Sequence, residues 1–247
     1  MIVNYEQAIL EVNKKNRNDL VKLVEKYKAY DFKKFCKVSQ SDPAIRHLPE
    51  NIKKKAKRTG DSAEEIWSAI RACPLYAKDF AKNPTKQTFH EHYAFNLLKE
   101  NTPYLKEIYN LSVGGNDALY LQNGQVINKQ EKSRENTTKS IDFHIVLNVK
   151  GIDYNIYVMH KYTKEAGGSQ DNQYHDVVEW SKQTIGVKEE NIYFIAILDG
   201  NYYQIVDKEQ GKTKIEHLND DIRTEHFRAM TLEDVPDFVE ELVKDRD

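Results

Sequence analysis

The stretch that decides the fold is residues 141–161, IDFHIVLNVKGIDYNIYVMHK. Every second side chain of its first half is apolar: Ile141, Phe143, Ile145, Leu147 and Val149. A period of two residues is that of a β-strand with one face toward a hydrophobic core. Gly151 predicts a turn, and YNIYVMHK (residues 154–161) predicts an antiparallel partner strand. We therefore expect a β-hairpin at the centre of the fold.

More strands are predicted on both sides of this hairpin. In LYLQNGQVI (residues 119–127), two short apolar alternations flank an Asn-Gly pair, which is typical of a two-residue β-turn. NIYFIAIL (residues 191–198) is a nearly continuous apolar run, typical of a central strand covered on both faces. An Asp-Gly pair then predicts a turn into a shorter strand, NYYQIV (residues 201–206). Together these segments predict a central sheet.

Helical periodicity precedes and follows the strands. Apolar side chains recur at intervals of three and four residues in segments 20–27, 66–73, 89–97, 174–181 and 235–242. The expected N-terminal caps are Asn18 or Asp19, Asp61 or Ser62, Asn83 before Pro84, and Thr231 with Asp234. This order predicts an α/β or α+β core (residues 85–247) with a mixed central sheet flanked by helices. A helical N-terminal region (residues 1–84) precedes it.

Charge and composition restrict the function. The 247 residues carry a formal net charge of -2, so any nucleic-acid contact must come from local clusters of Lys and Arg. The most basic run is KKKAKR (residues 53–58), which is either a solvated segment or a contact for DNA phosphates. Two cysteines predict neither a disulfide framework nor a zinc site. No apolar run approaches the roughly 20 residues of a membrane span, so we expect a cytoplasmic protein without a membrane partner.

Asp142 and Lys161 form the pair that could carry chemistry. Asp142 begins the first strand of the central hairpin, and Lys161 ends the second. TKSIDF (residues 138–143) and HKYTKEAGGSQDNQYHDV (residues 160–177) together resemble the PD-(D/E)xK nuclease superfamily, in particular type II restriction endonucleases. The resemblance covers roughly residues 85–200.

This resemblance implies a fold, a site and partners. The fold would be a restriction-endonuclease-like mixed sheet. Asp142 would bind Mg²⁺, and Lys161 would position or deprotonate the attacking water. The implied reaction is sequence-specific hydrolysis of double-stranded DNA that leaves 5′-phosphates. A two-fold homodimer is expected, because many such targets are palindromic.

One position departs from the family pattern. Met159 stands two residues before Lys161, on the same strand face, where the family has Glu, Asp or sometimes Gln. A thioether does not hold Mg²⁺. Glu91, in the helix before the core, is the candidate that would replace this acid as a catalytic residue and metal ligand. Weaker candidates are Glu165, Asp153 and Asp171. There are two other possibilities. The metal is held by Asp142, a backbone carbonyl and waters, or the enzyme is inactive.

The glycine pair in KYTKEAGGSQDNQ (residues 161–173) predicts a loop over residues 164–173 that approaches DNA. Backbone without Cβ can come close to a phosphate or a base edge, and the neighbouring polar side chains can donate and accept hydrogen bonds. The expected DNA-contacting residues are Lys164, Gly167, Gly168, Ser169, Gln170, Asn172 and Gln173. A merely flexible turn is the alternative.

Two histidines lie on the predicted hairpin. His144 shares the strand face of Asp142 and could lie near the site, whereas His160 alternates away from Lys161 and is expected to be structural. Two other functions also stay open. One is a repair or recombination nuclease, or a nickase, of the same fold. The other is a DNA-binding protein whose catalysis has lapsed, as Met159 suggests.

Overall fold

The computed structural model describes residues 1–83, 87–111, 114–133, 138–164 and 168–244. These residues form two compact units. The helical unit is Asn4–Lys86, and the core unit consists of Met1–Val3 and Gln87–Asp247. The N-terminus belongs to the core unit, where the Val3 amide donates to the Glu233 carboxylate (2.8 Å). The sequence does not foresee this return of the first three residues.

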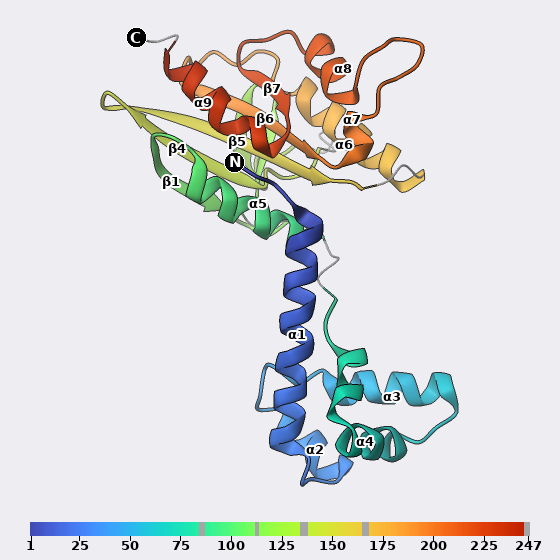
Figure 1. Ribbon diagram of the computed structural model, residues 1–247. Helices are drawn as coiled ribbons and strands as arrows, with labels where there is room; N and C mark the ends of the chain where they lie inside the picture. The colour runs from blue at the N-terminus through green and yellow to red at the C-terminus, as the bar shows by residue number, and fades with distance from the viewer. Residues whose placement is uncertain (84–86, 112–113, 134–137, 165–167, 245–247) are drawn as a thin grey trace. The chain divides into compact units, whose positions relative to one another are not determined.

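The core unit is built on a five-stranded mixed sheet with the order β1-β4-β5-β6-β7 (Figure 1). The strands are β1 (Leu105–Asn110), β4 (Phe143–Val149), β5 (Ile152–Tyr162), β6 (Ile192–Asp199) and β7 (Phe227–Met230). The first three strands pair antiparallel, and β5, β6 and β7 pair parallel. The predicted fold class is therefore confirmed: a mixed central sheet flanked by helices.

The central hairpin turns where the sequence predicts. Val149 pairs with Ile152 across a two-residue turn in which Lys150 and Gly151 both have positive φ (51° and 85°). Two positive φ values are those of the hairpin turn that matches the right-handed twist of the strands. The turn therefore sets the register, and this register brings residue 142 opposite the end of β5.

A second hairpin, β2 (Leu119–Gln122) and β3 (Gln125–Asn128), is also confirmed. Its turn residues Asn123 and Gly124 both have positive φ (49° and 79°). A Cβ at Gly124 would lie 2.6 Å from the backbone nitrogen of Val187, so only glycine allows this approach. The Gly124 amide donates to the Gln183 carbonyl, which attaches the hairpin to the segment after α6.

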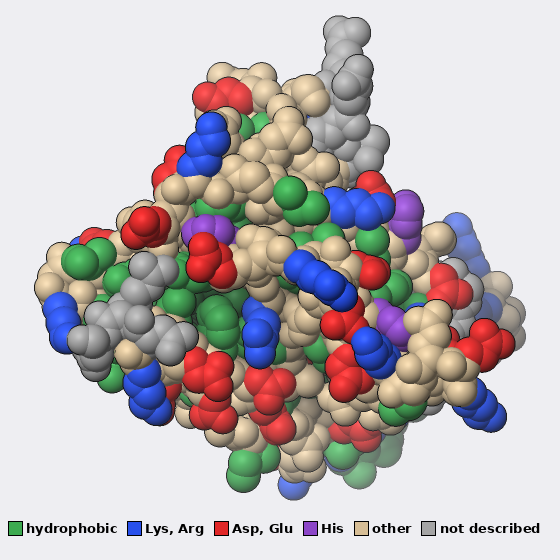
Figure 2. Space-filling model, turned by 90° about the horizontal axis from the view of Figure 1, so that it is seen from above, with side chains coloured by type: hydrophobic (Ala, Val, Ile, Leu, Met, Phe, Trp, Pro, Cys, Tyr) green, Lys and Arg blue, Asp and Glu red, His purple; other side chains and the backbone are tan. Residues whose placement is uncertain are grey.

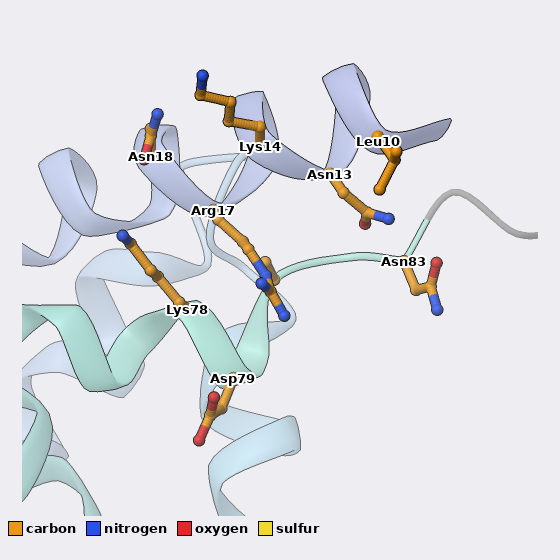
Figure 3. A pocket seen from close by; sticks show the side chains of 9 residues that line it. Leu10, Asn13, Lys14, Arg17, Asn18, Lys78, Asp79 and Asn83 are labelled. Carbon is orange, nitrogen blue, oxygen red and sulfur yellow. The ribbon is translucent and has the colours of Figure 1, made fainter. Parts of the chain in front are cut away.

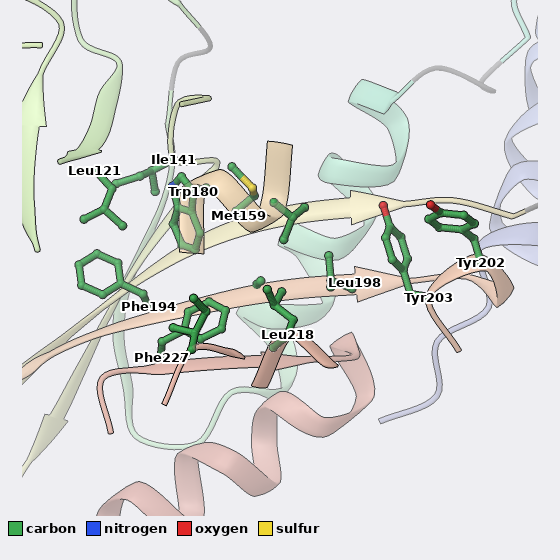
Figure 4. Close-up of a cluster of buried hydrophobic side chains, with 14 residues drawn as sticks. Leu121, Ile141, Met159, Trp180, Phe194, Leu198, Tyr202, Tyr203, Leu218 and Phe227 are labelled. Carbon is green, nitrogen blue, oxygen red and sulfur yellow. The ribbon is translucent and has the colours of Figure 1, made fainter. Parts of the chain in front are cut away.

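Helices cover both faces of the five-stranded sheet. On one face lies α5 (Gln87–Asn101), whose Phe95 ring contacts Phe143 (centroids 5.9 Å apart). On the other lies α6 (Gly168–Lys182). Figure 4 shows the core on that side, where Trp180 of α6 contacts Phe194 of β6. Since β6 is buried on both faces, its prediction as a central strand is confirmed.

The chain after β6 differs from the prediction. NYYQIV is not a strand, because α7 (Asn201–Gln204) begins directly after Gly200. Tyr202 and Tyr203 are buried in the α6-side core, and this burial overrides the β-propensity of the segment. The next elements are α8 (Lys214–Asp221), β7, the 3-10 helix η2 (Leu232–Asp234) and α9 (Val235–Lys244). The predicted capping box of Thr231 and Asp234 is confirmed at η2.

The helical unit contains α1 (Tyr5–Tyr27), α2 (Phe32–Ser39), α3 (Leu48–Thr59), α4 (Ala63–Ala72) and the 3-10 helix η1 (Pro74–Phe80). In its core, the Trp67 and Phe35 rings stack 4.0 Å apart. The predicted start of α4 is confirmed, with a capping box at Ser62. The expected start of the first helix at residue 18 or 19 is wrong. Its cap is Asn4, and the polar residues between are an exposed continuation of the same helix.

The basic run KKKAKR lies within α3. No described helix combines the length and the apolar character that crossing a lipid bilayer requires.

Candidate active site at the ends of β4 and β5

Asp142 and Lys161 lie together at one end of the central hairpin. The Lys161 Nζ is 3.7 Å from the Asp142 Oδ2. Both side chains are largely withdrawn from solvent, with 8% of the Asp142 side chain and 13% of the Lys161 side chain exposed. An ion pair of this length with little solvent access is screened far less than a surface pair. The structure therefore holds a carboxylate and an amine in one place, as the strand pattern predicts.

The backbone around Asp142 explains how its carboxylate is held. The Asp142 amide donates to the Val158 carbonyl (2.8 Å), and its carbonyl accepts from the Leu111 amide (2.9 Å). The next amide of β5 that points toward β4 is that of His160. It donates to the Asp142 Oδ2 at 2.8 Å, so a side-chain oxygen replaces the backbone acceptor. A buried amide needs such a partner, and meeting that need fixes the carboxylate beside Lys161.

Lys161 and His160 point to opposite faces of the sheet. Lys161 is in register with Leu198, on the α6 side, together with Met159. His160 is fully buried on the α5 side, where its Nε2 lies 3.4 Å from the Asp199 Oδ2. Asp199 also accepts from the Leu232 amide (2.9 Å), at the start of η2. His160 thus serves the packing of η2 on the sheet, and the alternation along β5 keeps its ring away from Lys161.

His144 is held away from the pair. Its ring stacks on Tyr157 (centroids 4.5 Å apart) and on Tyr109 (5.6 Å). Its Nε2 lies 2.9 Å from the Asn155 Oδ1. Burial lowers the pKa of His144, which favours the neutral ring in this stack. These contacts are structural.

Met159 occupies a core position. Its side chain is fully buried in the α6-side cluster, among Val177, Trp180, Phe194 and Ala196 (Figure 4). A carboxylate at this position would be desolvated in apolar surroundings, which costs several kcal/mol. The surroundings of residue 159 therefore suit the thioether of Met159 and do not suit the acid of the family pattern.

Glu91 is half-buried on α5. The residue before it, His90, packs on the Tyr162 ring (centroids 4.4 Å apart), which places α5 on the sheet face opposite to Lys161. Within residues 1–83, 87–111, 114–133, 138–164 and 168–244, no group of three or more His, Cys, Asp or Glu side chains converges in a way that could hold a metal ion. The role of Glu91 as a metal ligand stays a prediction.

Asp142 could hold a metal ion through one carboxylate oxygen. Its Oδ2 is used by the His160 amide and Lys161, which leaves Oδ1 as the oxygen for a metal. Mg²⁺ commonly takes only one or two protein carboxylates and completes its shell with waters and substrate phosphate oxygens. One carboxylate beside a positioned amine meets that minimum.

The predicted DNA-binding loop is in large part a helix. Gly167 lies outside the described residues, and α6 begins at Gly168 and includes Ser169, Gln170, Asn172 and Gln173. The expectation of a loop from 164 to 173 is therefore wrong for these five. Asp171 lies in the first turn of α6, where a negative charge stabilises the helix N-terminus.

Three residues near this helix start have defined surroundings. Lys164 and Asn172 are exposed. The Gln173 Oε1 accepts from the Thr163 hydroxyl (3.1 Å), and the same hydroxyl lies 3.2 Å from the Tyr203 hydroxyl. Gln173 thus ties α6 to the end of β5. Tyr203 gives no periodic signal in the sequence, because it belongs to the segment that reads as a strand.

His90 makes the stability of the core unit depend on pH. Burial, helped by the nearby His160, lowers the pKa of His90 to about 4. Between about pH 6.5 and 4, the unfolded chain binds a proton that the native His90 does not, so stability falls as the pH falls through this window. We expect His90 to account for a loss of about 2 kcal/mol in the free energy of unfolding between about pH 7.5 and 5.

The measurement is urea unfolding at both pH values in metal-free buffer. His90→Gln should lose less stability on acidification than the wild type. His92→Gln, on the exposed side of the same helix, is the control. An equal loss in all three proteins contradicts the assignment.

Comparisons with known proteins assign no family. No family model matches the chain, and no curated protein sequence matches it. Among solved structures, protein VC1899 from Vibrio cholerae is similar with a TM-score of 0.32 and 10% identity, over 92% of this chain and 55% of that one. The restriction endonuclease FokI is similar with a TM-score of 0.33 and 14% identity, over 74% of this chain and 31% of that one.

The chain thus spans about half of the length of the first protein and about a third of the second. Similarity at these TM-scores leaves the function to be argued from the geometry of the chain itself.

Proposed function

We propose that the chain is a metal-dependent endonuclease that hydrolyses double-stranded DNA, of the type II restriction class. The observation that carries this proposal is the Asp142–Lys161 pair, 3.7 Å apart at the end of two adjacent strands of a mixed sheet. A carboxylate and an amine in such a position serve phosphodiester hydrolysis, which needs a ligand for a cation and a group that handles the proton of water.

The two side chains take different parts in this proposal. Asp142 would hold Mg²⁺ through Oδ1. When bound, the ion stabilises negative charge on the phosphate. Lys161 would orient the attacking water and donate hydrogen bonds to a phosphate oxygen, while Asp142 keeps its ammonium group in place. The product would carry a 5′-phosphate. Glu91 would supply a second carboxylate if its side chain reaches past the end of β5 to the sheet face of Lys161 in the complex with DNA.

Lys164 and the start of α6 follow this pair directly in the chain. Exposed cations and the amides of a helix N-terminus both attract phosphate. We therefore keep Lys164, Gly168 and Asn172 as proposed DNA contacts. A two-fold homodimer would read a palindromic target.

Digestion of a mixed-sequence plasmid in the presence of Mg²⁺ tests this function. A type II restriction enzyme gives discrete fragments with 5′-phosphate ends. A repair or recombination nuclease of the same fold gives a smear, and a nickase gives open circles. Intact plasmid at high enzyme excess, in Mg²⁺ and in Mn²⁺, would rule out the nuclease proposal.

A second candidate is a DNA-binding protein without catalysis. The specific observation in its favour is Met159, which packs in the apolar core at the position of the family's acid. This candidate predicts binding of duplex DNA with no cleavage in either metal ion.

A further inference from the structure

Charge is divided unequally between the two units of the chain. Residues Asn4–Lys86 contain 19 Lys and Arg against 11 Asp and Glu, a formal net charge of +8. The remaining residues contain 18 against 28, a net charge of -10, which accounts for the total of -2. On the face shown in Figure 2, acidic side chains gather in several places among the basic ones. A charge asymmetry of this size suggests that the helical unit meets a polyanion.

Two helices of this unit present their basic residues as stripes. On α1, the basic residues Lys14 and Arg17 lie about one helical turn apart. On α3, Lys54 and Arg58 do the same. Residues separated by three, four or seven positions lie on one side of a helix, so each stripe forms a continuous row.

The two stripes line adjoining hollows of the same surface. The first has a volume of about 760 Å³ and lies between α1 and η1, with Lys14, Arg17 and Lys78 in its lining (Figure 3). The second, of about 610 Å³, is lined by Lys54, Lys55 and Arg58 of α3. Arg17, Asp79 and Ala81 line both. The hollows therefore form one groove, which we call the basic groove, and in Figure 3 Arg17 extends from α1 toward the end of η1.

The cations of the basic groove are available to a ligand. Two lysines of α3 are engaged: Lys53 pairs with Glu50 (2.8 Å), and Lys55, which also lines the groove, lies over the Tyr76 ring (4.4 Å) and 3.6 Å from Asp79. In contrast, no ion pair with any described residue involves the five other groove cations: Lys14, Arg17, Lys54, Arg58 and Lys78. Five neighbouring cations without a direct ion pair repel one another, and a bound polyanion removes this cost.

We propose that the basic groove binds the phosphodiester backbone of double-stranded DNA. On α1 the lining of the groove includes residues from Leu10 to Arg17, and on α3 it runs from Asn51 to Arg58. Each of these spans is about 10 Å of helix, and duplex DNA carries about six phosphate charges over that length. The five cations match this charge density. Amide side chains such as Asn13 and Asn51 add neutral donors for phosphate oxygens. A surface that binds another protein usually has a more apolar and aromatic centre than the lining of this groove. The choice of duplex DNA over other nucleic acids rests on the proposed nuclease function.

The test measures binding of the full chain to a labelled mixed-sequence duplex in EDTA, so that cleavage does not interfere. The triple variant Arg17→Ala/Lys54→Ala/Arg58→Ala removes three groove cations. The matched control, Lys22→Ala/Lys33→Ala/Lys37→Ala, removes three exposed cations of the same unit that do not line the groove. Asp79→Asn removes the acid between the two hollows.

The groove variant should raise Kd by about 10- to 100-fold near 0.1 M salt. It should also reduce the slope of log Kd against log salt by about 2.7, since each duplex phosphate contact contributes about 0.9. The control should change Kd by less than about threefold, and Asp79→Asn should tighten binding. Circular dichroism of each variant checks that the helices are retained.

Each outcome separates this proposal from the proposed function. If the chain binds DNA through the groove but does not cut it, the proposed DNA-binding groove is supported and the proposed nuclease function is contradicted. If the chain cuts DNA and the groove variant and the control bind the duplex with equal Kd, the groove proposal is overturned and the nuclease proposal stands. Tighter binding of RNA or single-stranded DNA than of the duplex would overturn the assignment to duplex DNA.

Discussion

Asp142→Asn and Lys161→Met are each expected to lower the rate of DNA cleavage by about 10³-fold or more, which corresponds to at least about 4 kcal/mol in the activation barrier. Asparagine keeps the size of the aspartate side chain and offers an oxygen to the His160 amide, but it removes the negative charge that would hold the metal ion. Methionine keeps most of the volume of the lysine and removes the amine that would handle the water.

The stabilities of the two variants should differ in a characteristic way. Lys161→Met leaves the Asp142 carboxylate, whose side chain is 8% exposed, without its cation, which we expect to cost about 1–3 kcal/mol. The double variant should lose less free energy of unfolding than the sum of the losses in the two single variants. Each single change leaves one buried charge without its partner, and the double change removes both charges.

Single-turnover cleavage and urea unfolding measure these effects, with Lys99→Ala on the exposed side of α5 as the control. Binding of duplex DNA in EDTA should stay within about threefold of the wild type in all variants, since the basic groove lies in the other unit. Cleavage at full rate by both Asp142→Asn and Lys161→Met would remove these residues from the site, whatever the fold.

Periodicity predicts those parts of the fold in which local pattern and tertiary packing agree. β4, β5 and β6 alternate or are continuously apolar, and each is a strand. β1 reads LKEIYN, with mostly exposed side chains, and β7 has four residues, so neither is long enough or regular enough to be recognised. NYYQIV has the composition of a strand, but a positive φ at Gly200 and the burial of two tyrosines turn it into α7.

The candidate site divides in the same way. The approach of Asp142 to Lys161 follows from a hairpin whose turn sets the register, so the sequence suffices for it. The hydrogen bond from the His160 amide does not follow, because it depends on where β4 stops pairing with β5. The residues after the glycine pair continue a helix that is anchored about three turns away, by the packing of Trp180 on Phe194. A local pattern of glycine and polar residues cannot predict that tertiary contact.

Gly200→Ala is expected to destabilise the core unit by about 3–5 kcal/mol, a large part of the total stability of a typical domain. Gly200 has a φ of 97° and a ψ of 161°, a region used almost only by glycine, which costs a residue with a side chain about 1–3 kcal/mol. A Cβ there would also lie 2.2 Å from the Thr163 carbonyl oxygen and 2.7 Å from its carbon. These are backbone atoms, and the Thr163 amide donates to the Asp199 carbonyl (2.9 Å). Neither backbone segment can therefore move without breaking the pairing at the end of β5.

Gly211→Ala is the matched control for this prediction. Gly211 also has a positive φ (68°), but no atom lies within 4 Å of a Cβ built there, so its substitution carries the backbone cost alone. Urea unfolding of both variants isolates the contribution of the close approach, which we expect to be at least about 2 kcal/mol. Because Thr163 follows Lys161 by two residues, Gly200→Ala should also reduce cleavage at temperatures where the variant remains folded, whereas Gly211→Ala should not. Equal losses of stability in the two variants would mean that β5 and α7 can separate without cost, and that the end of β5 is not held rigidly enough to position Lys161.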